Sequence, residues 1–442
     1  MPITSLARRR ANAYIGILCA LFLAGALLNA AAAHASTVTI RQAPDGQYTL
    51  LRDGKPYFIN GAGGVDHLAM LASLGGNSIR TWGVDQLDKQ ADGKPLLDRL
   101  QELNLTITAG IWVEHERHGF NYSDPAMLQK QRDTVRADVR KYKGSPALLI
   151  WGLGNEMEGP ASAGDDPRIW KELNVLAGIV KQEDPSHPVM TVIAGATAPK
   201  IEGILKYYPN IDILGVNAYS GASGVGRTLK GLGWKKPFIL TEFGPAGAWE
   251  VPATPWHAPI EPSSREKAGT YYATETGVVQ DAKDICLGSY VFLWGHKQEA
   301  TSTWYGMFLK TGEKLPTVDA IVRAWTGKWP PNRSPRIVSF TTPLREATVG
   351  AGQQVAASVV AEDPENDPLQ YEWTVTAEST DRKVGGDTES EPPSFPECTA
   401  SAHGSAVTIK TPTQPGAYRL FITVRDGQGG ASEDNVPFLV TQ

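Results

Sequence analysis

Short apolar runs alternate with longer amphipathic stretches between residues 55 and 329. The short runs are nearly continuous in apolar residues, which is typical of strands that are covered on both faces. Strands that alternate with helices predict parallel βα units, and eight of them predict a closed (β/α)8 TIM barrel, an α/β fold. The predicted strands are residues 57–61, 78–82, 106–113, 148–153, 189–194, 213–219, 238–243 and 288–294. The predicted helices include residues 95–103, 126–142, 168–183, 198–207 and 265–282.

Different patterns flank this region, which we take as residues 55–329. Residues 36–54 alternate apolar and polar positions around a Pro-Asp-Gly turn, which predicts a hairpin at the bottom of the barrel. The proline-rich residues 330–335 predict a linker, and residues 336–442 have the short alternating strands of a small all-β, immunoglobulin-like sandwich. We expect the barrel and the sandwich to have independent cores, with the sandwich acting as a spacer. The predicted sandwich strands include residues 354–360, 370–375, 406–409 and 418–424.

Residues 1–35 have the features of a signal peptide: three consecutive arginines, an apolar stretch, and a small-residue end at Ala33-His34-Ala35. The apolar stretch is shorter than the roughly 20 residues of a transmembrane helix. We therefore expect a secreted or periplasmic protein that has no contact with the membrane after cleavage. Cleavage changes the formal charge from −5 to −8, because three arginines and no acidic residues are lost. This negative charge argues against nucleic acid as a partner.

The ends of the predicted strands carry the candidate chemistry, because the reactive groups of a (β/α)8 barrel lie at the C-terminal ends of its strands. The fourth strand is followed by Glu156, and the seventh by Glu242. Retaining glycoside hydrolysis needs two carboxyls about 5–5.5 Å apart, one protonated and one ionised. We expect Arg80, at the end of the second strand, to keep Glu242 ionised while Glu156 stays protonated.

These strand ends resemble a known group of enzymes. Gly154-Asn155-Glu156 and Thr241-Glu242-Phe243-Gly244 are similar to the paired signatures of the retaining (β/α)8 glycosidase clan. Residues 55–325 most resemble the barrel of glycoside hydrolase family 2, and residues 80–83 are similar to family 5 mannanases and β-1,3-glucanosyltransferases. The resemblance implies that Glu156 is the acid/base and Glu242 the nucleophile. Family 2 enzymes usually carry sandwich domains before the barrel, so the resemblance does not extend to the substrate.

The same resemblance implies roles for other residues at the strand ends. Asn155 matches the residue that binds the 2-hydroxyl of the substrate, and Arg80 and Tyr219 match partners of the nucleophile. Trp82 lies in the family 5-like motif, and Trp294 matches the aromatic floor under the reacting sugar. Each has a structural alternative: an internal ion pair for Arg80, a packed ring for Tyr219, and closure of the barrel top for Trp294.

Two predicted loops add candidate substrate-binding residues, because both are rich in polar and aromatic side chains. Trp112 and His115 follow the third strand, while His296 and Trp304 follow the eighth. The His-Glu-x-His order of residues 115–118 lacks the spacing of a helical zinc motif, so no catalytic metal is expected.

The predicted sandwich offers one weak metal hypothesis. Asp363, Glu365 and Asp367 lie close together and could bind Ca2+ through carboxylate oxygens, although the same pattern is typical of an exposed turn. The surrounding residues 361–369, with residues 416–430, resemble bacterial PKD-like and cadherin-like modules.

Two cysteines remain after cleavage of the signal peptide. Cys286 and Cys398 could form one disulfide in an exported chain. Cys286 opens an apolar run, which favours a buried, reduced side chain instead.

The sequence therefore predicts an exported, cofactor-free retaining glycosidase that acts on a β-linked oligosaccharide or polysaccharide. Transglycosylation would use the same two carboxylates and is the nearest alternative. A non-catalytic carbohydrate-binding protein is an alternative of another class, because a fold does not by itself fix a function. The presence of both carboxylates disfavours that alternative.

Overall fold

The structure is a computed structural model, and it describes residues 35–158, 163–383, 385–400 and 403–442. The predicted signal peptide lies outside the described residues, except for its last position. None of the helices in the described part of the chain is long and apolar enough to cross a membrane.

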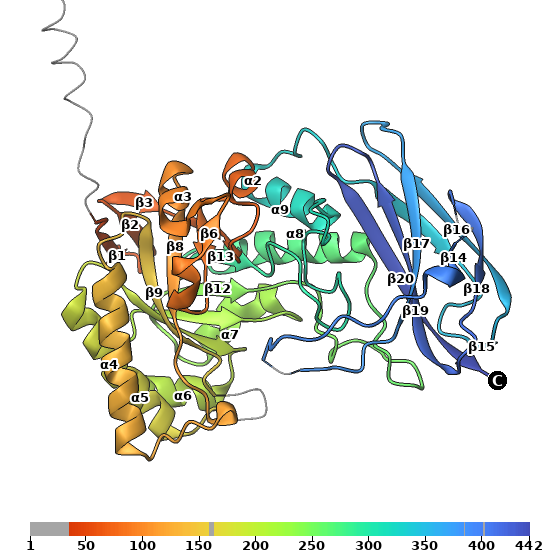
Figure 1. Cartoon of the computed structure of the whole chain (residues 1–442). Coiled ribbons are helices and arrows are strands. Elements are labelled where there is room, and N and C mark those ends of the chain that lie inside the picture. The colour runs from red at the N-terminus through yellow and green to blue at the C-terminus, as the bar shows by residue number, and fades with distance from the viewer. Residues whose placement is uncertain (1–34, 159–162, 384, 401–402) are drawn as a thin grey trace, which may run out of the picture. The chain divides into compact units, whose positions relative to one another are not determined.

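Eight parallel strands close into a barrel, as the sequence predicts (Figure 1). The barrel closes where β13 pairs with β4, in a register that places Gly288 beside Ile59. Nearly every residue of these strands is buried, because helices cover the outside and side chains fill the interior. The strands are β4 (Ile59–Gly63), β5 (Ser78–Arg80), β8 (Thr106–Ile111), β9 (Leu148–Asn155), β10 (Val189–Ala194), β11 (Ile213–Asn217), β12 (Phe238–Glu242) and β13 (Cys286–Val291).

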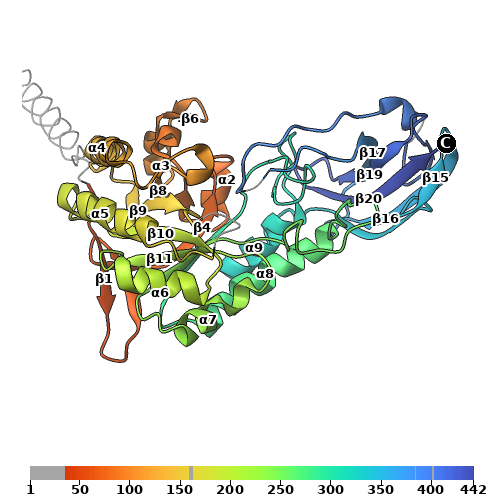
Figure 2. The ribbon, with the colours of Figure 1, turned by 90° about the horizontal axis from the view of Figure 1, so that it is seen from below.

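The helices follow one another around the outside of the barrel (Figure 2). Asp124 and Asp166 cap two of the long helices by accepting hydrogen bonds from the first-turn N–H groups, and a proline follows each cap. The predicted helices are α3 (Leu96–Glu102), α4 (Pro125–Tyr142), α5 (Pro167–Glu183), α6 (Ala198–Tyr207) and α8 (Ser264–Asp281). Those that the sequence pattern did not predict are α2 (Leu68–Ser73), α7 (Val225–Gly231) and α9 (Pro316–Thr326). The first two are too short to show a clear helical period.

A small antiparallel sheet lies at the bottom of the barrel. It contains the predicted hairpin, β1 (Val38–Gln42) and β2 (Tyr48–Arg52), and adds β3 (Lys55–Tyr57). Val38 and Leu50 of the hairpin share one apolar cluster with side chains from the first residues of the barrel strands. The predicted position of the hairpin is therefore confirmed.

The C-terminal part forms two sheets, which confirms that it is all-β. One sheet has the order β14–β16–β18, and the other β15–β20–β19–β17. Alternate side chains of the strands bury one apolar core that contains Trp373 and Cys398. Both Cys286 and Cys398 are buried and free, so the disulfide hypothesis is wrong. The strands are β14 (Arg336–Thr341), β15 (Thr348–Gly350), β16 (Gln354–Glu362), β17 (Gln370–Ala377), β18 (Ala406–Lys410), β19 (Gly416–Arg425) and β20 (Ala431–Thr441).

The sandwich is more than a spacer, because buried polar side chains join it to the barrel. Arg419, which is 2% exposed, donates to Pro259 O at 2.9 Å and pairs with Glu378. Glu261 accepts hydrogen bonds from Lys267 on α8 and from Asn435 on β20. A flexible spacer would leave such groups in water, so these contacts argue against a sandwich that acts only as a spacer.

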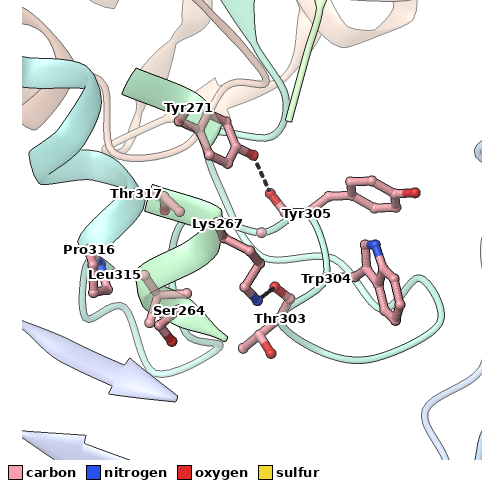
Figure 3. A pocket seen from close by; sticks show the side chains of 10 residues that line it. Ser264, Lys267, Tyr271, Thr303, Trp304, Tyr305, Leu315, Pro316 and Thr317 are labelled. Carbon is pink, nitrogen blue, oxygen red and sulfur yellow. Dashed lines mark hydrogen bonds between the residues drawn. The ribbon is translucent and has the colours of Figure 1, made fainter. Parts of the chain in front are cut away.

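Two cavities lie beside α8, and neither is lined by Glu156 or Glu242. The smaller, of about 10 Å3, lies between α8 and the loop that follows β13 and has room for about one water molecule (Figure 3). There, Lys267 Nζ donates to Thr303 O at 2.7 Å, and Tyr271 OH donates to Tyr305 O at 3.3 Å. The larger, of about 640 Å3, lies between α8, α9 and the sandwich. These contacts hold the loop against α8.

Candidate active site

Glu156 and Glu242 stand at the C-terminal ends of β9 and β12, as the sequence predicts. Glu242 is the last residue of β12, and Glu156 follows the last residue of β9. The backbone turns sharply at the end of β9, with φ of 73° at Gly154 and 51° at Glu156. A hydrogen bond of 2.9 Å from Glu156 N to Val192 O holds the turn against β10. A left-handed conformation is unfavourable for Glu, so the surrounding contacts must stabilise it.

Glu242 has a partner for each carboxylate oxygen and is 6% exposed. Its Oε1 accepts hydrogen bonds from Arg80 Nη1 at 2.8 Å and from Trp82 Nε1 at 2.9 Å. Its Oε2 accepts one from Tyr219 OH at 2.9 Å. Donors and a buried cation favour the ionised form of a carboxyl. These three hydrogen bonds therefore hold the Glu242 carboxyl in a fixed direction.

Glu156 has a poorer set of partners. Its Oε1 accepts a hydrogen bond of 2.8 Å from Asn217 Nδ2. Burial, and after it the nearby negative charge of Glu242, raise the pKa of Glu156 to about 7. A carboxyl with this pKa holds a proton near neutral pH and can also release it, as a general acid and base must.

One hydrogen-bond network joins the two glutamates. Arg80 donates to Glu242 through Nη1 and to Asn155 Oδ1 through Nη2, the second at 2.6 Å. Asn217 Nδ2 donates to Asn155 Oδ1 at 3.2 Å as well as to Glu156. Thr241 Oγ1 donates to Asn217 Oδ1 at 2.8 Å, which sets the orientation of that amide. Of this group the sequence predicted the two glutamates, Arg80 and Asn155 as site residues, but not Asn217 or Thr241.

The aromatic side chain beside this network is Phe292, and not Trp294 as the resemblance implied. The Phe292 ring lies edge-to-face with Trp82 at 5.9 Å and with Tyr219 at 6.0 Å between centroids. Trp294 is 1% exposed and packs against Phe308 and Trp325 in the core. Its alternative reading, a side chain that closes the top of the barrel, fits this position.

The other predicted substrate-binding residues lie at different depths. Trp112 is 38% exposed, 5.1 Å from the buried His115 ring between centroids. Burial, with the charges of Arg117 and His118, lowers the pKa of His115 to about 4. Trp304 is buried and donates from Nε1 to Ala246 O at 3.0 Å, which ties two loops together.

His296 lies toward the sandwich. Burial lowers its pKa, and the negative charge of Glu391 in the sandwich acts in the opposite direction.

The sequence analysis missed one exposed aromatic residue near the site. Trp249 is 70% exposed, and its ring lies 6.3 Å from that of Tyr219. Its place in the loop that follows Glu242 was the signal in the sequence.

The calcium hypothesis receives no support. Asp363 Oδ1 accepts backbone hydrogen bonds from Glu365 and Asp367, both at 2.9 Å, as in a turn. Glu365 pairs with Arg333. Within residues 35–158, 163–383, 385–400 and 403–442, no three His, Cys, Asp or Glu side chains group as metal ligands. The turn alternative therefore fits better than the calcium site.

The comparisons with known proteins bear on this barrel. Residues 100–248 match the family model described as Glycosyl hydrolases family 2, TIM barrel domain. The matched segment contains both glutamates and supports a glycosidase. No curated protein sequence matches the chain.

Solved structures of glycosidases have a similar fold. A Bacteroides uniformis β-glucuronidase has a TM-score of 0.50 and 16% identity, over 91% of this chain and 48% of that one. A Dictyoglomus thermophilum β-D-glucuronidase has 0.50 and 17%, over 67% and 54%. A Ruminococcus gnavus β-glucuronidase has 0.51 and 15%, over 66% and 53%. The chain thus spans about half the length of these proteins, and at this identity the likeness concerns the fold.

Proposed function

We propose that this protein is a retaining glycosidase that cleaves β-linked oligosaccharides or polysaccharides by double displacement. Glu242 is the nucleophile and Glu156 the general acid and base. The observation that carries the proposal is the pair of buried glutamates in one network with opposite surroundings. Glu242 has three side-chain donors, whereas Glu156 accepts from the Asn217 amide and has a raised pKa. Two carboxyls in unlike environments are what the two roles require.

The first step forms a covalent intermediate. Glu242 attacks the anomeric carbon, a bond forms between that carbon and a carboxylate oxygen, and the bond to the leaving oxygen breaks. Glu156 gives its proton to the leaving oxygen. Arg80, Trp82 and Tyr219 hold the attacking carboxylate in place.

The second step releases the sugar. Glu156, now ionised, removes a proton from a water molecule, and the oxygen of that water attacks the anomeric carbon. The bond to Glu242 breaks, so both glutamates return to their starting states. Two inversions at the same carbon give net retention of the β configuration. A sugar hydroxyl in place of the water would give transglycosylation through the same steps.

The stereochemistry of the first product tests the mechanism. A panel of aryl β-glycosides, including a β-glucuronide because of the names of the similar structures, first identifies a substrate. NMR should then show the β anomer before mutarotation. A first-formed α anomer would require an inverting enzyme, whose carboxyls stand roughly 6.5–9.5 Å apart to admit a water molecule. Product analysis at high acceptor concentration separates hydrolysis from transglycosylation.

We also propose that the protein acts outside the cytoplasm. The support is the signal-like pattern of residues 1–35. Expression in a bacterium with a cell envelope, followed by N-terminal sequencing of the periplasmic fraction, should find a chain that begins at Ser36. A full-length chain that stays in the cytoplasm would contradict the proposal.

A further inference from the structure

One segment of the sandwich, residues 385–391 between β17 and the short helix η4 (Pro396–Cys398), contacts the barrel. Lys297 Nζ donates to Gly386 O at 2.9 Å, and Ala300 N donates to Glu389 Oε2 at 2.8 Å. His118 Nε2 lies 3.6 Å from Asp387 Oδ2. The segment therefore reaches the loops that follow both β8 and β13.

The closeness of Gly385 to the barrel shows how tightly this segment packs. Gly385 has φ of 67°, and a Cβ built there would stand 2.8 Å from Arg117 Nη2. A side chain at this position would be strained and would also push the arginine away. The loop after β8 and the sandwich segment are thus in direct contact.

The loops after β8 and β13 both contact side chains close to Glu242, the proposed nucleophile. Lys297 Nζ lies 5.4 Å from the centre of the Phe292 ring, which contacts Trp82 and Tyr219, two donors to Glu242. On the other side, a Cβ built on Gly83, the residue after Trp82, would stand 3.8 Å from Trp112 Cβ. The sandwich segment thus contacts side chains that are separated from the catalytic network by only one or two intervening side chains.

The side chains on this second side form a cluster with the chemistry of a sugar site. Trp112 is 38% exposed, and its ring lies nearly parallel to that of His118, at 17° and 6.2 Å. The side chains of His118 and Asp387 are 36% and 44% exposed. The buried His115, whose ring is 5.6 Å from His118, has an Nε2 with no partner among the described residues. An indole face accommodates sugar C–H groups, and a carboxylate and imidazoles bind hydroxyls.

We propose that Trp112, His118 and Asp387 form a second sugar-binding subsite, outside the one that holds the reacting sugar. The substrate is then a β-linked chain of at least two sugars, and the sandwich supplies part of its binding site. This inference rests on the proposed function and deepens it.

Binding measurements test the subsite without relying on turnover. The full-length Glu242→Ala variant is titrated calorimetrically with trisaccharides of β-1,3-glucan, β-1,4-mannan and β-1,4-galactan, and with the matching methyl β-glycosides. Asp387→Ala and Trp112→Ala are then added singly to that background. Glu397→Ala is the matched control, because Glu397 is an exposed carboxylate of the sandwich.

We expect at least one trisaccharide to bind more tightly than its methyl glycoside. Asp387→Ala and Trp112→Ala should each weaken trisaccharide binding about tenfold, which is typical for the loss of a charged hydrogen bond or a stacking contact. Methyl glycoside binding, the thermal midpoint and the Glu397→Ala variant should not change. Equal weakening for both ligand sizes would indicate a purely structural segment and overturn the subsite.

The two proposals can fail separately. If the wild type cleaves aryl β-glycosides but no trisaccharide binds better than its methyl glycoside, the subsite is wrong and the glycosidase stands. If no β-glycoside is cleaved but a trisaccharide binds through Trp112 and Asp387, the catalytic proposal is wrong and the subsite stands.

Discussion

Buried glutamates occur at two places with opposite surroundings: at the mouth of the barrel, and where the barrel contacts the sandwich. Glu261, at the contact, accepts hydrogen bonds from Lys267, Thr301, Thr303 and Asn435. Burial opposes ionisation there, yet the charges of Lys267 and Arg419 lower its pKa. Glu156, at the mouth, has a raised pKa although the amide of Asn217 donates a hydrogen bond to it. Burial alone therefore does not decide whether a carboxyl is charged; its partners do.

A raised pKa alone does not identify the active site either. Burial also raises the pKa of Glu275 and of Glu433 to about 7. Glu275 accepts a hydrogen bond from Ser289 within the barrel wall, and Glu433 accepts one from Thr423 within the sandwich. Glu433 even has a second carboxyl, Glu261, beside it. What distinguishes Glu156 is that it and Glu242 both stand at the C-terminal ends of barrel strands, where the reactive groups of this fold lie. Two unlike carboxyls at the strand ends are the better criterion for a candidate site.

The largest expected effect is the loss of turnover in Glu242→Ala. Without the nucleophile, kcat should fall by about 10⁴-fold or more, since no covalent intermediate can form. Azide should restore turnover and give an α-linked glycosyl azide, detected by NMR. Glu202→Ala, on the exposed face of α6, is the control and should keep wild-type activity. A β-linked azide product would exchange the roles of Glu156 and Glu242.

The interface network should show its effect on stability. Arg419→Ala should lower the free energy of unfolding by about 3 kcal/mol, because it removes the buried cation of Glu378 and leaves that carboxylate only the partly exposed Arg382. Arg336→Ala is the control, since its pair with Glu362 is half exposed and should contribute about 1 kcal/mol or less. Denaturant unfolding measures both.

Deletion of residues 336–442 should likewise destabilise the barrel and expose it to proteolysis. A truncated barrel that unfolds at the wild-type midpoint would restore the view of the sandwich as a spacer.

The pH profile tests the contrast between the two carboxyls. Glu156 must be protonated to act as an acid, and its pKa is raised to about 7, so kcat/KM should fall as the pH rises above about 7. Asn217 donates to the ionised carboxylate and so lowers this pKa. Asn217→Ala should therefore move the basic limb to higher pH. The limb should be absent in Glu156→Gln assayed with an activated aryl glycoside; an unchanged limb there would assign it to another group.

The smallest effects separate the two aromatic residues after β13. Phe292→Ala should raise KM several-fold, up to about tenfold, because the ring contacts Trp82 and Tyr219 beside Glu242. Trp294→Phe should leave KM unchanged and lower the free energy of unfolding by about 1–3 kcal/mol through imperfect packing. Initial rates and thermal unfolding distinguish them. The opposite pattern would return the substrate-binding role to Trp294.

The sequence by itself determined the elements of the barrel and the positions of Glu156 and Glu242. Strand and helix periods are local properties, and in this fold the end of a strand is also the place where side chains gather. The hairpin at residues 37–52 could also be predicted, because its alternating pattern and its turn are local properties. The short helices α2 and α7 were not, because six or seven residues hold too little of a period.

Arg80 and Tyr219 were expected beside Glu242 from the resemblance, but only the tertiary structure showed the other contacts of the site. β13 ends at Val291, so the alternation of a strand no longer governs Phe292 and Trp294, and packing sends the two rings to different places. Asn217 becomes the partner of Glu156 across 61 positions of sequence, and Asp387 approaches His118 from another sheet. Contacts between residues so far apart depend on how whole helices and strands pack, and a local sequence pattern does not determine that packing.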